Sequence, residues 1–167
     1  MSKFEEICLA YSQARRTFNE YEETCRDFAR ELVFGMVDYL EWPQDQEITY
    51  IPLGEEFDPS NRFYALAGAM RMGDESFWHF GVELAVHDQG RSYPSSFVLS
   101  FFIKKVGEHF VVKLGPNGRE IRIPEGARGQ LDPFYEAVFL QIKNFFAKDY
   151  IKALTGTERE FGFITLL

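Results

Sequence analysis

The chain has no apolar run long enough to cross a membrane, and its N-terminus lacks the pattern of a secretory signal. No stretch approaches the roughly 18 consecutive apolar residues of a membrane-spanning helix. Glu5 and Glu6 follow Lys3, where a signal sequence would continue with apolar residues. We therefore expect a cytoplasmic protein with no membrane partner.

Cysteine is also scarce. Cys8 and Cys25 are 17 residues apart in one predicted helix, which separates them by about 25 Å along its axis. A disulfide needs Cα atoms within about 7 Å of each other, so an intrachain bridge is excluded. We expect both cysteines to be small buried thiols in a reducing compartment.

Runs of basic residues are missing as well. The longest are the pairs Arg15-Arg16 and Lys104-Lys105, and 18 Lys and Arg against 26 Asp and Glu give a formal charge of −8. Nucleic-acid affinity depends on many Lys and Arg contacts to phosphate, so we exclude nucleic acid as a partner. The acidity suits a basic protein partner, although solubility explains it equally well.

Apolar residues, in contrast, are abundant and strongly patterned. Hydrophobic residues make up 46% and aromatic residues 17% of the 167 residues, which predicts a single folded domain with a real core. In residues 1–41 apolar side chains recur every three or four positions, the spacing of one helix face. We predict one long helix, continuous or gently bent, with a kink near Gly35 as the alternative. The apolar stripe is formed by Phe4, Ile7, Tyr11, Ala14, Phe18, Tyr21, Cys25, Phe28, Leu32 and Met36.

This helix is too long for its domain. It would span roughly 55 Å, whereas a compact chain of this length has a diameter of about 40 Å. The protruding stripe needs cover from a second copy, another partner or a bend. We favour self-association as a homo-oligomer, most simply a dimer, over purely internal burial. The residues expected to carry it are Phe4, Tyr11, Phe18, Tyr21 and Phe28.

Residues 47–124 change to the period of two that is typical of strands. Expected strands are 48–53, 63–72, 77–87, 97–106, 109–114 and 119–123, and their short turns require antiparallel pairing. The turn at 115–118 sets Val112 opposite Ile121 and Phe110 opposite Ile123. A second predicted hairpin sets Met70 opposite His79.

A final helix is predicted over residues 132–155, because Asp132-Pro133 is typical of a helix start and Thr155-Gly156 of a helix end. The tail at 160–167 is apolar and fits a further strand or a docking segment. The expected fold class is α+β: a long N-terminal helix, an antiparallel meander sheet of five to six strands, and a C-terminal helix packed on the sheet.

The strand at 77–87 carries the most suggestive polar residues. Alternation places His79, Glu83 and His87 on one face, but residues four apart on a strand are separated by about 13 Å, too far to share a metal ion without other strands. We therefore predict no metal site. The same face could receive a packed helix, which we favour, or form the floor of a cavity for an apolar small molecule, with candidate residues Tyr64, Met70, His79, Glu83 and His87.

No other pattern indicates a catalytic residue or a cofactor. Carboxylates gather at residues 45–58, and the nearby Gly54, Pro59 and Ser60 indicate a solvated loop. The glycine-rich segment 124–130 lacks the Gly-Lys-Ser/Thr ending of a P-loop. We expect a non-enzymatic binding or interaction module that self-associates through its N-terminal helix. The alternative is a binder or enzyme for an apolar small molecule held between sheet and helix.

Overall fold

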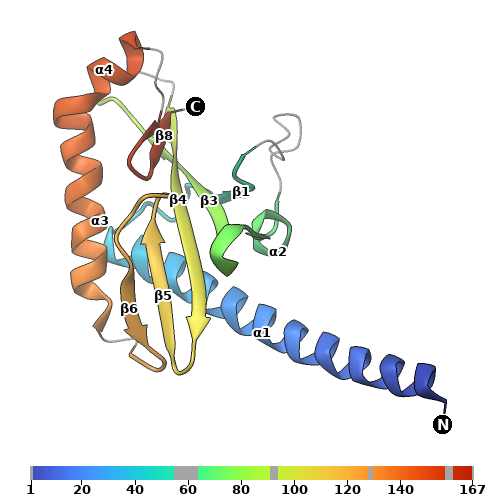
Figure 1. Cartoon of the computed structure of the whole chain (residues 1–167). Coiled ribbons are helices and arrows are strands. Elements are labelled where there is room, and N and C mark those ends of the chain that lie inside the picture. The colour runs from blue at the N-terminus through green and yellow to red at the C-terminus, as the bar shows by residue number, and fades with distance from the viewer. Residues whose placement is uncertain (1, 55–63, 91–93, 128–129, 157–159, 167) are drawn as a thin grey trace.

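A computed structural model of the protein describes residues 2–54, 64–90, 94–127, 130–156 and 160–166. It confirms the predicted α+β class, with a long N-terminal helix, an antiparallel sheet and a C-terminal helix (Figure 1). Of the carboxylates at residues 45–58, those at 55, 56 and 58 lie outside the described residues.

The first helix, α1, runs without interruption from Lys3 to Tyr39. Ser2 caps it: its hydroxyl accepts a hydrogen bond from the backbone N–H of Glu5, and the Glu5 carboxylate accepts one from the backbone N–H of Ser2. This reciprocal pair satisfies two otherwise unpaired donors at the helix start. The negative charges of Glu5 and Glu6 also complement the helix dipole there.

In the described part of the chain the sheet has eight strands, five of which lie in the order β1-β3-β4-β5-β6, and every pair in it is antiparallel. The bounds of these five are Thr49–Ile51, Trp78–Val86, Ser95–Val106, His109–Leu114 and Ile121–Pro124. Short strands extend it: β2 (Arg71–Met72) pairs with β3, and β8 (Ile164–Leu166) pairs with β4 and with β7 (Glu160–Phe161). The apolar tail thus contributes strands to the sheet.

The predicted register of the last hairpin is confirmed. Val112 pairs with Ile121, and Phe110 pairs with Ile123. The tight turn at Gly107-Glu108 joins β4 to β5, with Val106 paired to His109. Gly107 has a φ of +60°, a conformation that glycine adopts without steric cost.

The predicted strand at residues 63–72 is wrong. Residues Leu66–Ala69 form a short helix, α2, and only Arg71–Met72 pair with β3. Arg71, rather than Met70, lies opposite His79. The segment Leu-Ala-Gly-Ala has no β-branched residue, and alanine and leucine favour helix over strand.

The core lies on one face of the sheet, under the second half of α1 and the C-terminal helix. Phe80 and Val82 of β3 pair with Phe101 and Leu99 of β4, and all four are fully buried. The C-terminal helix consists of α3 (Asp132–Asn144), a π-helical turn (Phe145–Asp149) and α4 (Tyr150–Thr155). Residues of α1 buried in this core are Cys25, Phe28, Ala29, Leu32, Val33 and Met36.

Gly35 sits where α1 crosses the C-terminal helix. A Cβ added there would lie 2.9 Å from Cζ of Tyr135 and closer still to its hydroxyl oxygen. Glycine inside a helix normally costs about 0.5–1 kcal/mol relative to alanine. Glycine at position 35 therefore lowers the helix propensity of α1 but allows the Tyr135 ring to lie against the backbone of α1.

We expect Gly35→Ala to destabilise the fold by about 1–3 kcal/mol, despite the better helix propensity of alanine, because the added methyl group overpacks against Tyr135. Denaturant unfolding measures the change. The control adds Gly35→Ala to a Tyr135→Leu protein, in which the clash is absent. There the alanine should lower the free energy of unfolding by less than it does in the wild type. An increase in stability for the single variant would contradict the packing at this crossing.

Candidate functional site

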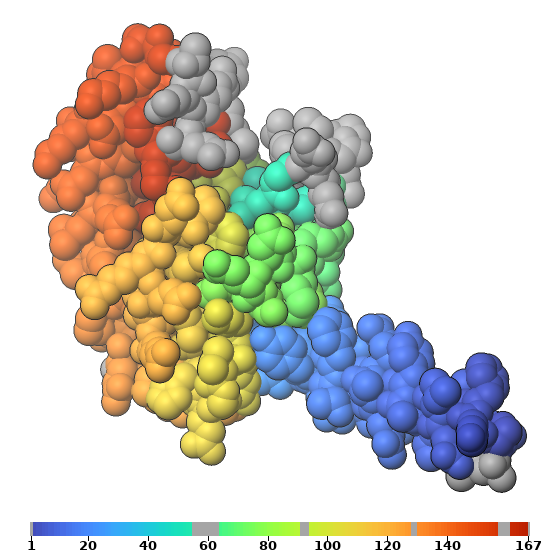
Figure 2. All heavy atoms as spheres, viewed as in Figure 1, coloured from blue at the N-terminus to red at the C-terminus, as the bar shows by residue number. Residues whose placement is uncertain are grey.

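The first fifteen residues of α1 form a rod that leaves the body of the protein. All of residues 3–17, hereafter the arm, are exposed, and Figure 1 and Figure 2 show this blue segment projecting beyond the sheet with the N-terminus at its far end. Its apolar side chains are solvated: Phe4 is 73%, Ile7 67% and Tyr11 66% exposed. Large apolar side chains gathered on one face usually mark an interaction surface.

The arm stripe continues directly into the core. At the point of entry, the ring of Phe18 lies 6.1 Å from that of Trp78, and the hydroxyl of Tyr21 accepts a hydrogen bond of 3.4 Å from the backbone N–H of Lys105. One helical face is therefore covered by the sheet in its second half and uncovered in its first half.

The five residues predicted for self-association thus occupy three environments. Phe4 and Tyr11 lie on the exposed arm, and Phe18 and Tyr21 are half-buried at its base. Phe28 is buried, and its ring stacks on Phe110 at a centroid distance of 3.8 Å. Phe28 belongs to the core of its own chain, so it is not part of the exposed stripe of the arm.

The two cysteines differ in the same way. Cys25 is fully buried, as expected, but Cys8 is exposed on the arm, and both are free thiols. Burial raises the pKa of the Cys25 thiol above its usual value, which keeps it in the unreactive protonated form at neutral pH. Cys8 was expected to be buried because its helix position adjoins the stripe, but the arm stripe has no cover within the chain.

Charge also distinguishes the arm from the body. The arm carries Lys3, Arg15 and Arg16 against Glu5 and Glu6, a net charge of +1, so the rest of the chain carries −9. Two bodies therefore repel each other strongly, whereas two arms, each with a net charge of +1, repel each other only weakly.

The residues predicted to form a ligand cavity do not converge. Met70 is buried in the core. Tyr64 packs against that core, and its backbone forms an isolated β-bridge with Tyr50. His79 and Glu83 are half-buried on the opposite face of β3, and His87 is exposed beyond its end. The centre of that face, at Gly81, is closed, since a Cβ there would lie 2.7 Å from Cγ1 of Ile51 and 2.8 Å from Cγ1 of Val98.

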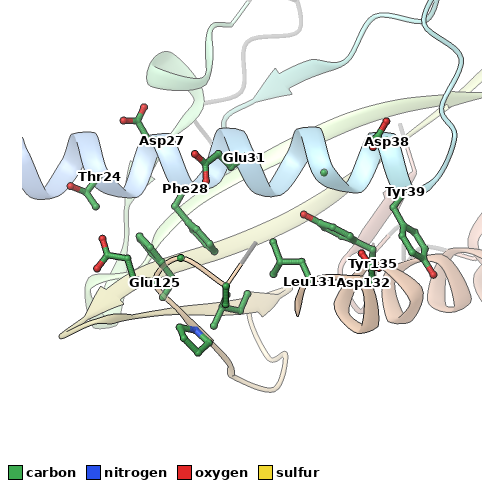
Figure 3. A pocket seen from close by; sticks show the side chains of 16 residues that line it. Thr24, Asp27, Phe28, Glu31, Asp38, Tyr39, Glu125, Leu131, Asp132 and Tyr135 are labelled. Atoms are coloured by element: carbon green, nitrogen blue, oxygen red, sulfur yellow. The ribbon is translucent and has the colours of Figure 1, made fainter. Parts of the chain in front are cut away.

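A different hollow lies between α1 and the C-terminal half of the chain. This groove has a volume of about 730 Å³. Figure 3 shows α1 along one side, with side chains from α3 and from the segment around Glu125 facing it. Phe28, Phe110, Ile123 and Leu131 supply apolar lining, and five carboxylates also line the groove: Asp27, Glu31, Asp38, Glu125 and Asp132.

Two of these carboxylates are neutralised by neighbours. Asp27 pairs with Arg30 at 2.9 Å, and Glu125 pairs with Lys105 at 2.9 Å. Asp38 and Asp132 line the other end of the groove. Asp132 lies beside Tyr135, whereas the Asp38 side chain points to the other side of α1 from both tyrosines (Figure 3).

Both tyrosines hold their protons at neutral pH. Burial, reinforced by Asp132 and Glu31, raises the pKa of Tyr135 to about 12. Tyr39 donates a hydrogen bond of 2.7 Å to Glu136, and that bond raises the pKa of its hydroxyl. This end of the groove therefore combines carboxylates with neutral phenols.

Sequence reasoning missed the groove because its walls come from segments nearly a hundred residues apart. Asp27, Glu31 and Asp38 follow helical spacing on one side of α1, and that acidic row was the available signal. The row alone gives no indication that β5, β6 and α3 lie opposite it.

Comparison with known proteins assigns no role to any of these surfaces, since no family model, curated protein or solved structure matches the chain. Among the described residues, no group of three or more His, Cys, Asp or Glu side chains is placed to hold a metal ion. None of the helices in that part of the chain has the length and hydropathy to cross a bilayer.

Proposed function

We propose that this protein is a non-enzymatic interaction module that self-associates by pairing the arm of one copy with the arm of another. The observation that supports this most strongly is the exposed apolar stripe formed by Phe4, Ile7 and Tyr11, which continues a stripe buried in the same helix. Isolated helices of about fifteen residues are marginally stable in water. A partner along the stripe stabilises the arm and removes its apolar side chains from solvent.

A second copy fits this surface better than an acidic or a strongly basic partner. The arm has a net charge of only +1, so it offers little electrostatic attraction to either. Two arms of charge +1 meet with little repulsion, and their projection keeps the two bodies, each of charge −9, apart. Apolar contact between identical stripes then provides the affinity.

The oligomeric state in solution tests this function. One chain has a mass of 19.5 kDa, so light scattering on a size-exclusion column should give about twice that value at micromolar to millimolar concentration, falling towards one chain on dilution. A mass of 19.5 kDa at every concentration would refute self-association.

A second candidate function is binding of an apolar organic cation in the groove. The observation that favours it is the combination of apolar lining at Phe28 and Phe110 with Asp38 and Asp132 at one end. Its volume of about 730 Å³ falls within the range of small-molecule sites. A cation would be attracted by the carboxylates while its apolar part replaces water on the aromatic lining.

Thermal unfolding with an aromatic quaternary ammonium compound tests the groove. At a concentration one hundred times the dissociation constant, the midpoint should rise by about 5–10 °C. The matched variant is Asp38→Asn with Asp132→Asn, which should lose most of this rise, and a neutral isostere of the compound should give little of it. An equal rise in the variant would place the compound elsewhere.

A further inference from the structure

Two arms can pair in two orientations, and the residues along the arm distinguish them. In a parallel pair, residues of the same number lie level with each other. Glu5 and Glu6 of both copies then gather at one end, and Arg15 and Arg16 of both gather at the other. The two acidic bodies also emerge side by side. The parallel pair therefore brings like charges together twice, along the arms and between the bodies.

From these placements, and on the basis of the self-association proposed above, we propose that the arms pair antiparallel about a two-fold axis at Tyr11. Tyr11 is the natural centre because Phe4 and Phe18 are equally distant from it, seven residues on either side. The tip of each arm then lies level with the base of the other. The pairing closes on itself and gives a dimer rather than a filament.

The apolar contacts in this register are complementary in size. Ile7 and Ala14 lie on the same edge of the stripe at 100° per residue, so each Ile7 packs against the small Ala14 of the second copy. Phe4 at the tip reaches the level of Phe18 in the second copy, where that ring already lies against Trp78. The exposed ring of Phe4 thus extends an aromatic cluster that exists at the base of the arm.

Net charge favours the same register, because the two bodies, each of charge −9, lie at opposite ends of an antiparallel pair. Cys8 and Arg15 follow the other edge of the stripe, whereas Glu5 lies about 120° from Tyr11 around the helix and is held in the capping box with Ser2. The guanidinium of Arg15 already lies over the stripe, with Cζ 5.5 Å from the centroid of Phe18. Opposed helix dipoles add a further favourable term.

The unusual exposure of Cys8 makes the orientation measurable by disulfide cross-linking of the full chain. In the antiparallel register, the two Cys8 residues are about 9 Å apart along the axes and should not cross-link. Residue 15 of one copy lies beside Cys8 of the other, so Arg15→Cys should give a dimer held by disulfides on a non-reducing gel. Cys25 does not compete, because it is fully buried.

Two further variants separate the orientation from self-association itself. Phe4→Cys places cysteines about 21 Å apart in the antiparallel pair but side by side in the parallel pair. Tyr11→Cys lies on the axis and should cross-link in either orientation. We expect mild oxidation to convert most of the Arg15→Cys and Tyr11→Cys chains, and few of the Phe4→Cys chains, to covalent dimers.

Cross-linking of Phe4→Cys together with Tyr11→Cys would overturn the antiparallel arrangement and leave self-association standing, because residues of the same number lie level only in a parallel pair. Absence of cross-linking in all three variants, together with a monomeric mass, would overturn both.

Discussion

Replacing Ile7 and Tyr11 together by glutamate should convert the protein to a monomer. Both side chains lie on the exposed stripe of the arm, 67% and 66% accessible in a single chain. Burial of an apolar side chain contributes about 1.5–3 kcal/mol, and a two-fold interface loses each of the two twice. The dissociation constant should therefore rise more than about 1,000-fold. Sedimentation equilibrium measures it directly.

The matched control for this variant is Leu9→Glu. Leu9 is also apolar and 53% exposed, but it points to the opposite side of the helix from Tyr11. It tests whether any charge added to the arm disrupts the dimer. We expect the dissociation constant of the Leu9 variant to stay within a few-fold of the wild type. Equal effects of the two changes would show that the stripe is not the contact surface.

Replacing Phe28 by alanine should instead strongly destabilise the body. Phe28 lies on the same helical stripe as Phe4, but it is buried and stacked on Phe110 at 3.8 Å. Truncation of a buried phenylalanine costs about 3–5 kcal/mol through lost burial and the cavity left behind. That is a large part of the 5–15 kcal/mol that typically holds a domain together. Denaturant unfolding, performed on dilute protein to exclude dimers, measures the loss.

Phe4→Ala is the control for Phe28→Ala, because it makes the same chemical change at a position that is 73% exposed. We expect it to alter the free energy of unfolding by less than about 0.5 kcal/mol. It should nevertheless weaken the dimer. The reverse ranking of the two variants in monomer stability would contradict the division of α1 into arm and core segments.

Local patterns in the sequence predicted most of the fold because they reported burial. The three- and four-residue spacing in α1 and the alternation in β3 to β6 each reflect a face that packs on the core. The turn glycine at 107 and the pairing of Phe110 with Ile123 follow from short-range geometry. The segment 66–69 was misassigned because a four-residue helix is too short to show a period.

The candidate sites were harder to predict because they depend on which segments meet. The stripe of α1 has one apolar pattern along its whole length, but only its second half is buried. Phe28 packs on Phe110, whereas Phe4 is exposed to solvent. Periodicity cannot show where the sheet ends. The predicted hairpin sets Met70 opposite His79 and so puts both on one face. In the structure Arg71 is opposite His79, a shift of one residue, and such a shift moves each side chain to the other face of the sheet.

Amide hydrogen exchange along the arm tests the central claim most directly, because it locates the contact as well as detecting it. We expect the amides of residues 3–17 to exchange slowly at concentrations well above the dissociation constant and quickly well below it. The amides of Leu32 and Val33, which lie in the core of each chain, should be slow at both. Exchange of the arm that is fast and independent of concentration would contradict pairing through this surface.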